Sequence, residues 1–300
     1  MDAQGITSLT EALRNVPGIT MQAGEGGGGL PGDTFTMRGF SSRNDIFIDG
    51  IRDAGGYSRD AFNLEQVEVI KGPSSSIAGR GATGGAVNQV TKTPHLESEQ
   101  RATIGLGNAE FRRGTFDLNR PIEALGDGAA FRLNAMWTDS GVAGRDVVAN
   151  RSWGVAPSLA IGLDSPTQLS VKYQHLAQDN VPDYGLPWGS YPDFPTGAFE
   201  ATPPIDQSNF YGLENYDFED IRSDVATVDV NRTLPRGMTL RNATRFSDTE
   251  RDSAITAPRP PNRQLQRRNM GNTNLANQTN LTTAFGGGTV QHELVTGLEI

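Results

Sequence analysis

The chain has 300 residues, with 36 Gly, 17 Pro and no Cys, and its formal net charge at pH 7 is -9. The acidic balance argues against a nucleic-acid partner, because phosphate binding needs a basic surface that releases counterions. The absence of Cys excludes disulfides, thiolate metal sites and a Cys nucleophile. Frequent Gly and Pro, beside many Val, Ile, Leu and Phe, indicate short strands joined by turns.

Residues 1–95 are predicted to form a small α+β domain. The spacing of Ser8 and Glu11 is that of a capping box, and apolar residues then recur at helical intervals until Pro17 ends the helix. Strands are predicted at 35–38, 46–48 and 67–70, and the pair Asp49 and Gly50 favours a tight hairpin turn.

Residues 96–300 are predicted to form roughly nine long strands, each with one apolar and one polar face. In one of them Leu169, Val171 and Tyr173 alternate with polar side chains. Such strands escape a search for long apolar helices, because alternation lowers the mean hydropathy. The fold class that we expect is therefore an all-β transmembrane barrel that follows an α+β domain.

The connections in this second region alternate between short and long. Short turns are predicted at 124–128, 164–166, 234–237 and 286–288, and long connections at 139–151, 179–220 and 250–262. Bacterial outer-membrane barrels have tight periplasmic turns and long outer loops. A soluble antiparallel sandwich also has alternating strands, but Arg241 and Arg245 on one face suit a polar barrel interior better than an apolar core.

No motif in the chain supports an enzyme. Residues 79–84 match G-x-G-x-x-G, but no hydrophobic strand precedes them and a strand-like segment follows them, so we exclude a dinucleotide site. The three His residues are far apart and have no second ligand at a metal-binding spacing. We therefore expect no catalysis, no cofactor and no metal site.

Four segments in order, 13–19, 37–40, 48–50 and 67–73, resemble the plug domain of TonB-dependent receptors, and 84–92 continues the likeness. In the second region, segments at 111–115, 143–146, 154–158 and 209–212 are similar to the receptors for monomeric catecholate siderophores. The resemblance implies a plug inside a barrel of about 22 strands. It also implies that the chain lacks a signal peptide, a TonB box and the rest of the barrel.

The resemblance further implies TonB-dependent import of a ferric siderophore of the monomeric catecholate type across the bacterial outer membrane. The expected partners are the ferric siderophore, TonB with its inner-membrane complex, and outer-membrane lipid, and the iron arrives already chelated. An anionic aromatic chelate suits guanidinium and aromatic side chains. The candidate ligand-binding residues are Arg38, Arg43, Arg52, Tyr57 and Arg59 in the plug and Trp188 and Tyr191 in the long connection.

The sequence leaves open the role of the arginines and the role of the acidic connection. Exposed arginines can simply favour solubility, and Arg38 has an ion pair with a barrel carboxylate as its alternative role. The connection 179–220 carries nine acidic residues and no Lys or Arg, so it should repel a free anion. It could instead bind divalent cations, pair with arginines of another loop, or favour a ferric hydroxamate or other metal chelate. A passive porin-like or adhesive barrel is the alternative of a different class.

Overall fold

A computed structural model gives the fold, and it describes residues 5–22, 32–42, 45–74, 82–126, 128–187, 205–259, 262–287 and 290–300. Within these ranges we find no helical segment with the length and hydropathy of a transmembrane span.

The predicted helix forms as α1 (Leu9–Arg14). Its N-terminus is capped by Ser8, whose Oγ accepts a hydrogen bond from the Glu11 amide at 3.2 Å. The Glu11 carboxylate in turn accepts from the Thr7 amide at 2.7 Å. Both bonds satisfy amides that lack a partner within the helix. Leu9 and Leu13 are buried on one face, as the helical spacing predicts.

Two small sheets complete the N-terminal region, by which we mean the described residues before β8. One has the order β1 (Ile19–Met21), β2 (Phe35–Met37), β3 (Phe40–Ser41). The other has the order β5 (Ile51–Arg52), β4 (Ile46–Ile48), β7 (Gly85–Thr91), β6 (Leu64–Lys71), with β4 and β7 parallel. Their shared core contains Leu9, Leu13, Phe35, Met37, Ile46 and Val87, so the expected α+β domain is confirmed.

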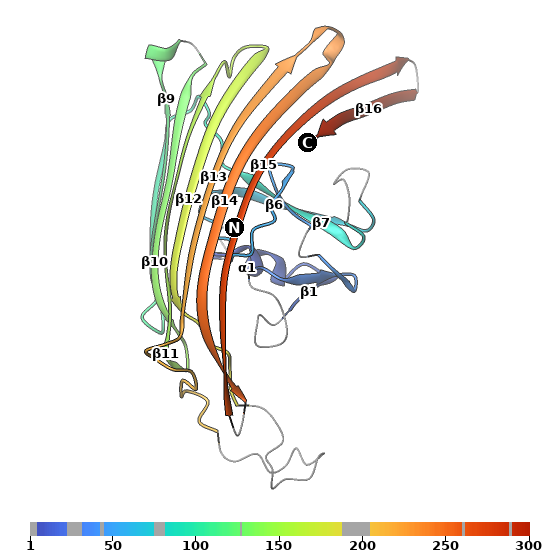
Figure 1. Cartoon of the computed structure of the whole chain (residues 1–300). Helices are drawn as coiled ribbons and strands as arrows, with labels where there is room; N and C mark the ends of the chain where they lie inside the picture. Colours follow the sequence, from blue (N-terminus) through green and yellow to red (C-terminus); the bar gives the residue numbers. More distant parts are fainter. Residues whose placement is uncertain are drawn as a thin grey trace.

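The rest of the described chain forms one sheet of nine strands, in which each pairs antiparallel with the next along the chain. Its strands are β8 (Glu99–Leu106), β9 (Arg112–Pro121), β10 (Ala130–Val142), β11 (Arg145–Ile161), β12 (Thr167–Val181), β13 (Phe218–Thr233), β14 (Thr239–Arg259), β15 (Asn262–Gly287) and β16 (Val290–Glu299). Short 3₁₀ turns, η3 (Glu123–Leu125) and η5 (Pro235–Gly237), lie in two of its connections. Figure 1 shows that this large sheet is strongly curved and that the N-terminal region lies on its concave side.

The two faces of the large sheet have the opposite polarity to those of a soluble sandwich. On the convex face, Val171, Val228 and Phe246 are exposed by 46%, 43% and 46%. On the concave face, Asn134 and Arg245 are almost fully buried. A soluble sandwich buries its apolar face, whereas a membrane barrel turns that face toward lipid and keeps its interior polar. The pattern therefore favours the barrel over the sandwich.

Two of the predicted long connections were wrong. The segments at 139–151 and 250–262 are mostly strand, because β10 and β11 turn tightly at 143–144, and β14 continues to Arg259 and pairs with β15 from Asn262 onward. The prediction was wrong there because these segments are polar. The apolar alternation stops in these segments, but the backbone ladder continues, with Asp139 opposite Arg151. The connection 182–217 remains long, and its described residues lie at the end of the sheet opposite the short turns 162–166 and 234–238 (Figure 1).

Candidate functional site

Four of the seven predicted ligand-binding residues lie in the described chain, and Arg43, Trp188 and Tyr191 lie outside it. Arg38 follows β2 in a left-handed conformation, with a φ of 53°, and its side chain is exposed. A Cβ atom added at Gly72 would lie 3.2 Å from Arg38 Nη1. The guanidinium therefore lies over the start of the connection that follows β6.

Arg52 ends the short hairpin strand β5. Its Nη1 lies 3.4 Å from Asp45 Oδ1, and its guanidinium lies 4.9 Å from the centre of the Phe47 ring. The Arg52 side chain is still 20% exposed, whereas the Phe47 ring beneath it is buried, so the cation is the part of this pair that solvent can reach.

Arg59 and Tyr57 are buried together in the loop between β5 and β6. The Arg59 guanidinium lies 4.4 Å from the centre of the Tyr57 ring. All five of its N–H groups are engaged. The acceptors are Asp53 Oδ2, Asp33 Oδ2 and the carbonyl oxygens of Asp53, Gly55 and Tyr57. In this arrangement Arg59 holds the loop and has no N–H left for a ligand.

The carboxyl groups around Arg59 show how closely the charges are balanced. Burial acts to raise the pKa of both Asp33 and Asp53. For Asp33 burial prevails and the pKa is raised, whereas for Asp53 the charge and hydrogen bonds of Arg59 outweigh burial and lower the pKa. Burial also raises the pKa of Tyr57, whose hydroxyl donates to Asp53 Oδ2 at 3.0 Å. The Tyr57 hydroxyl is therefore neutral.

The turn between β4 and β5, which we call the 49–50 turn, is docked on the large sheet. Asp49 and Gly50 both have positive φ, 48° and 84°, as the predicted type of hairpin turn requires. Carbonyl oxygens of four consecutive residues accept hydrogen bonds from side chains of β14 and β15. The bonds run from Arg245 Nη1 to Ile48 (2.7 Å) and Ile51 (3.3 Å), from Arg241 Nη2 to Asp49 (3.1 Å) and from Gln278 Nε2 to Gly50 (3.4 Å).

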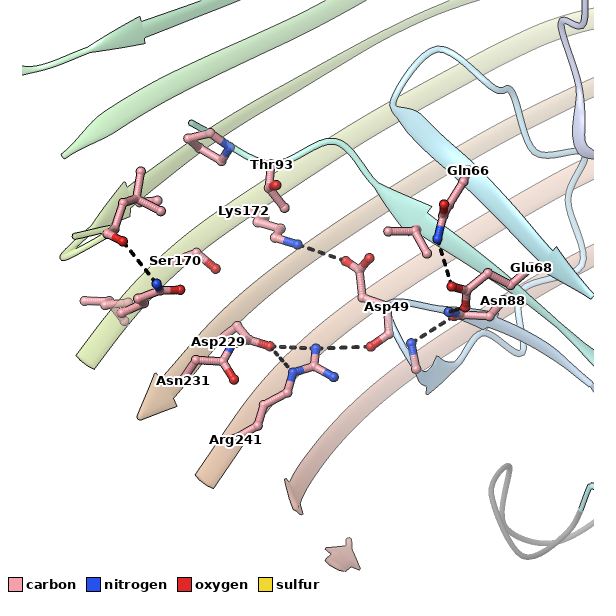
Figure 2. Close-up of a pocket in the computed structure, with 17 residues that line it drawn as sticks. Asp49, Gln66, Glu68, Asn88, Thr93, Ser170, Lys172, Asp229, Asn231 and Arg241 are labelled. Carbon is pink, nitrogen blue, oxygen red and sulfur yellow. Dashed lines mark hydrogen bonds and ion pairs between the residues drawn. The ribbon is translucent and has the colours of Figure 1, made fainter. Parts of the chain in front are cut away.

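The Asp49 carboxylate strengthens this docking (Figure 2). Its Oδ2 lies 3.1 Å from Lys172 Nζ on β12 and accepts from Thr91 Oγ1 at 2.7 Å. Burial acts to raise the pKa of Asp49, but Lys172, the hydrogen bonds from Thr91 and the charge of Arg245 together lower it. Asp49 is therefore a buried anion held from both sides.

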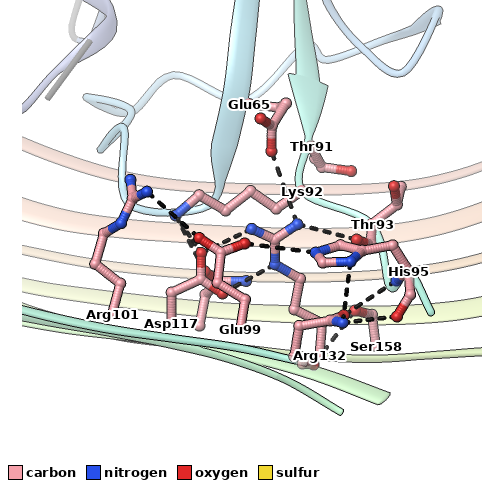
Figure 3. A network of polar contacts seen from close by, with 12 residues as sticks. Glu65, Thr91, Lys92, Thr93, His95, Glu99, Arg101, Asp117, Arg132 and Ser158 are labelled. Atoms are coloured by element: carbon pink, nitrogen blue, oxygen red, sulfur yellow. Dashed lines mark hydrogen bonds and ion pairs between the residues drawn. The ribbon is translucent and has the colours of Figure 1, made fainter. Parts of the chain in front are cut away.

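A second polar network ties the end of the N-terminal region to β9 and β10 (Figure 3). Lys92 Nζ lies 3.0 Å from Asp117 Oδ2. Arg132 makes a two-pronged contact with the same carboxylate, at 2.9 and 2.8 Å, and donates to the Thr93 carbonyl at 3.0 Å. Nearby, Arg113 on β9 makes two 2.7 Å bonds to the Asp60 carboxylate.

The sequence alone assigns these docking residues no role. It placed Arg241 and Arg245 on the polar face of a strand, and that parity was the available signal. The partners of the docking residues could not be predicted from the sequence. Asp49, for example, is 123 residues from Lys172. Proximity of that kind follows from the curvature of the large sheet.

Two acids of the segment predicted as the 179–220 connection, Asp183 and Glu219 at the start of β13, pair with arginines. Arg145, beside the 143–144 turn, binds the Asp183 carboxylate at 2.6 and 2.9 Å and also donates to the carbonyl of Gln207. Arg251 on β14 lies 2.6 Å from Glu219. Of the three explanations left open above, pairing with arginines therefore accounts for these two acids.

A cavity of about 470 Å³ lies between the 49–50 turn and β11 to β14. Plug-side and sheet-side polar groups line it, including Glu68, Asn88, Ser170, Asp229 and Asn231. In the described ranges, no group of three or more His, Asp or Glu side chains could hold a metal ion. The candidate site therefore consists of the charge-assisted contacts around the 49–50 turn and the polar cavity beside them.

Comparison with known proteins shows which families the chain resembles. Residues 1–86 match the TonB-dependent Receptor Plug Domain family. The chain is 42% identical over 99% of its length to the catecholate siderophore receptor Fiu of Escherichia coli K12, of which it covers 41%. It is 39% identical, again over 99% of its length, to the probable TonB-dependent receptor BfrD of Bordetella pertussis, of which it covers 40%. The chain thus spans about two-fifths of these curated relatives.

Solved structures agree with the sequence relatives. The closed form of Fiu from Escherichia coli K12 matches with a TM-score of 0.90 and 41% identity, over 99% of this chain and 44% of that one. The siderophore receptor PiuA from Acinetobacter baumannii matches with a TM-score of 0.85 and 28% identity, over 98% of this chain and 43% of that one. The chain therefore belongs to the TonB-dependent receptor family, and it combines a plug domain with strands of the receptor barrel.

Proposed function

We propose that the protein imports a ferric siderophore of the monomeric catecholate type across the bacterial outer membrane, with energy delivered by TonB and its inner-membrane complex. The observation that carries this proposal is the 42% identity to the catecholate siderophore receptor Fiu, which runs through plug and barrel alike. The iron is cargo in its chelate, and the protein performs no chemistry on it.

The arrangement of the fold supports an outer-membrane location. The exposed apolar side chains of the convex face suit contact with lipid, and the polar concave face suits a plugged interior. We place the plug at residues 1–95 and the barrel at 96–300. Support for this boundary comes from β7, which ends at Thr91, and β8, which begins at Glu99.

Among the candidate ligand-binding residues, Arg38 and Arg52 suit an anionic aromatic chelate. Arg38 presents an exposed guanidinium, and Arg52 places a cation beside the Phe47 ring. We assign Arg59 and Tyr57 to holding the loop between β5 and β6, because their polar groups are buried and engaged. Arg43, Trp188 and Tyr191 stay candidates for the same ligand.

A receptor for another chelate is the second candidate. The ferrioxamine receptor of Yersinia enterocolitica is 31% identical over 71% of this chain, and the metal-pseudopaline receptor CntO of Pseudomonas aeruginosa is 36% identical over 50%. A passive porin-like or adhesive barrel fits less well, because it gives no reason for a plug held by Lys172, Arg245 and Arg113.

The test is a binding titration of the purified receptor in detergent, followed by tryptophan fluorescence, with a ferric monocatecholate and separately a ferric hydroxamate. We expect saturable quenching by the monocatecholate and weaker binding in Arg38→Ala. The matched control is Arg14→Ala, which removes the arginine at the end of α1. Tighter binding of the hydroxamate would reject the catecholate assignment, and equal binding by Arg38→Ala and wild type would reject the role of Arg38.

A further inference from the structure

The plug and the barrel are in contact in several zones, and a gap lies between two of these zones. In one zone the 49–50 turn is bonded to β12, β14 and β15. In the other, Lys92 and Thr93 are bonded to β9 and β10. Between them the plug residues Glu68 and Asn88 face β11, β12 and β13 across the cavity of about 470 Å³.

The position of the cavity is at the end of the barrel where the short turns lie. Ala160 at the end of β11, Leu163 in the 162–166 turn and Gln168 near the start of β12 all line it. Short turns mark the periplasmic side of bacterial outer-membrane barrels. The cavity therefore opens on the side toward which an imported molecule leaves.

The lining is polar and charged, and it carries the carboxylates of Asp49, Glu68 and Asp229 beside two cations. In the described chain its two cationic side chains are Lys172 and Arg241, and each is already held by a carboxylate, Asp49 for Lys172 and Asp229 for Arg241 (Figure 2). An anionic group that reached either cation would exchange with that carboxylate instead of meeting an unpaired charge. Such exchange keeps binding weak enough for release, which conduction through a pore requires.

We propose that this cavity is a transit site, through which the anionic metal chelate passes between plug and barrel over β12 and β13, with contacts to Lys172 and Arg241. The inference rests on the proposed function, because it assigns the route of the molecule that the receptor imports. The chelate class is an anion whose phenolate or similar oxygen atoms accept charge-assisted hydrogen bonds.

Bulky side chains in the cavity test the route. Ser170→Trp and Asn231→Trp place an indole in the gap, while Val171→Trp and Val228→Trp place it on the lipid face of the same two strands. The probe is a ferric dihydroxybenzoate complex with radioactive iron, measured in cells as surface binding without energy and as uptake with energy. We expect normal binding in all four variants, and uptake reduced to the level of cells without TonB in the two cavity variants alone. Normal uptake by both cavity variants would overturn the proposal.

A chemical block covers the case in which a Trp variant fails to assemble. The chain has no Cys, so Ser170→Cys adds a single thiol to it that a bulky reversible thiol reagent can modify after assembly. We expect the modified variant to stop importing and to resume after reduction, while the reagent leaves wild type unaffected. Uptake by the fully modified variant would overturn the route. Failure of wild type to import the complex would instead count against the proposed function, so the two failures are distinguishable.

Discussion

Arg59 shows how the role of one residue depends on its burial. The sequence places an arginine and a tyrosine in a plug loop and suggests that both bind ligand. The structure instead surrounds the guanidinium with two carboxylates and three carbonyl oxygens and leaves 3% of the side chain exposed. Sequence alone could not make this distinction, because Asp33 and Arg59 are 26 residues apart.

We expect Arg59→Met to destabilise the plug by about 3–5 kcal/mol, because it leaves buried carboxylates without their partner. The control is Arg52→Met, whose partly exposed ion pair should contribute about 0–1 kcal/mol. Resistance of the plug to protease in the heated, detergent-solubilised receptor measures both. Equal resistance of the two variants would contradict the structural role of Arg59.

Asp49 gives a prediction on pH. Its folded pKa is lowered, since Lys172 and Thr91 outweigh burial, while an unperturbed Asp has a pKa of about 3.9. A lowered acid pKa contributes stability that is present above the unfolded value and is lost as the pH falls through the folded value. We therefore expect the docked turn to loosen below about pH 4.

Asp49→Asn tests this assignment, because it keeps the shape of the side chain and removes its titration. Cleavage of the plug by an acid-stable protease, followed as a function of pH, should show an acid step in wild type that is reduced in the variant. An identical acid step in both proteins would assign the loosening to other carboxylates.

At the scale of elements, sequence predicted the strands well and some connections poorly. Period-two alternation located β12 and β13, because membrane strands have one lipid face and one interior face. The same signal fades where β10, β11, β14 and β15 extend beyond the apolar band, so polar strand was mistaken for loop. Hydrogen bonds of the backbone ladder continue in those segments regardless of side-chain polarity.

The lipid-facing band gives a prediction for these strands. Val171 is 46% exposed on the convex face and lies opposite Val228. We expect Val171→Arg to destabilise the inserted barrel by about 2–4 kcal/mol near the bilayer midplane, whereas Val171→Phe should be tolerated. Folding of the receptor into lipid vesicles, followed by its heat-modifiable gel mobility, measures both variants. Equal folding of the two would contradict a lipid position for Val171.

At the scale of the whole molecule, motif order identified the receptor class, but the docking of plug on barrel required the structure. The plug segments lie close together in sequence and carry their own turn and strand signals. Several docking contacts, such as those of Arg245 with Ile48 and of Asn63 with Gln174, join residues more than a hundred positions apart. Any inward polar residue of a strand could have been the partner, and curvature selects among them.

Active import can be measured as uptake of a radioactive ferric monocatecholate by cells that carry the receptor in the outer membrane. We expect saturable uptake in cells with TonB and surface binding without uptake in otherwise identical cells that lack TonB. Uptake that persists without TonB would reject active import and favour a passive barrel, and an absence of uptake in both strains would reject the catecholate as the substrate.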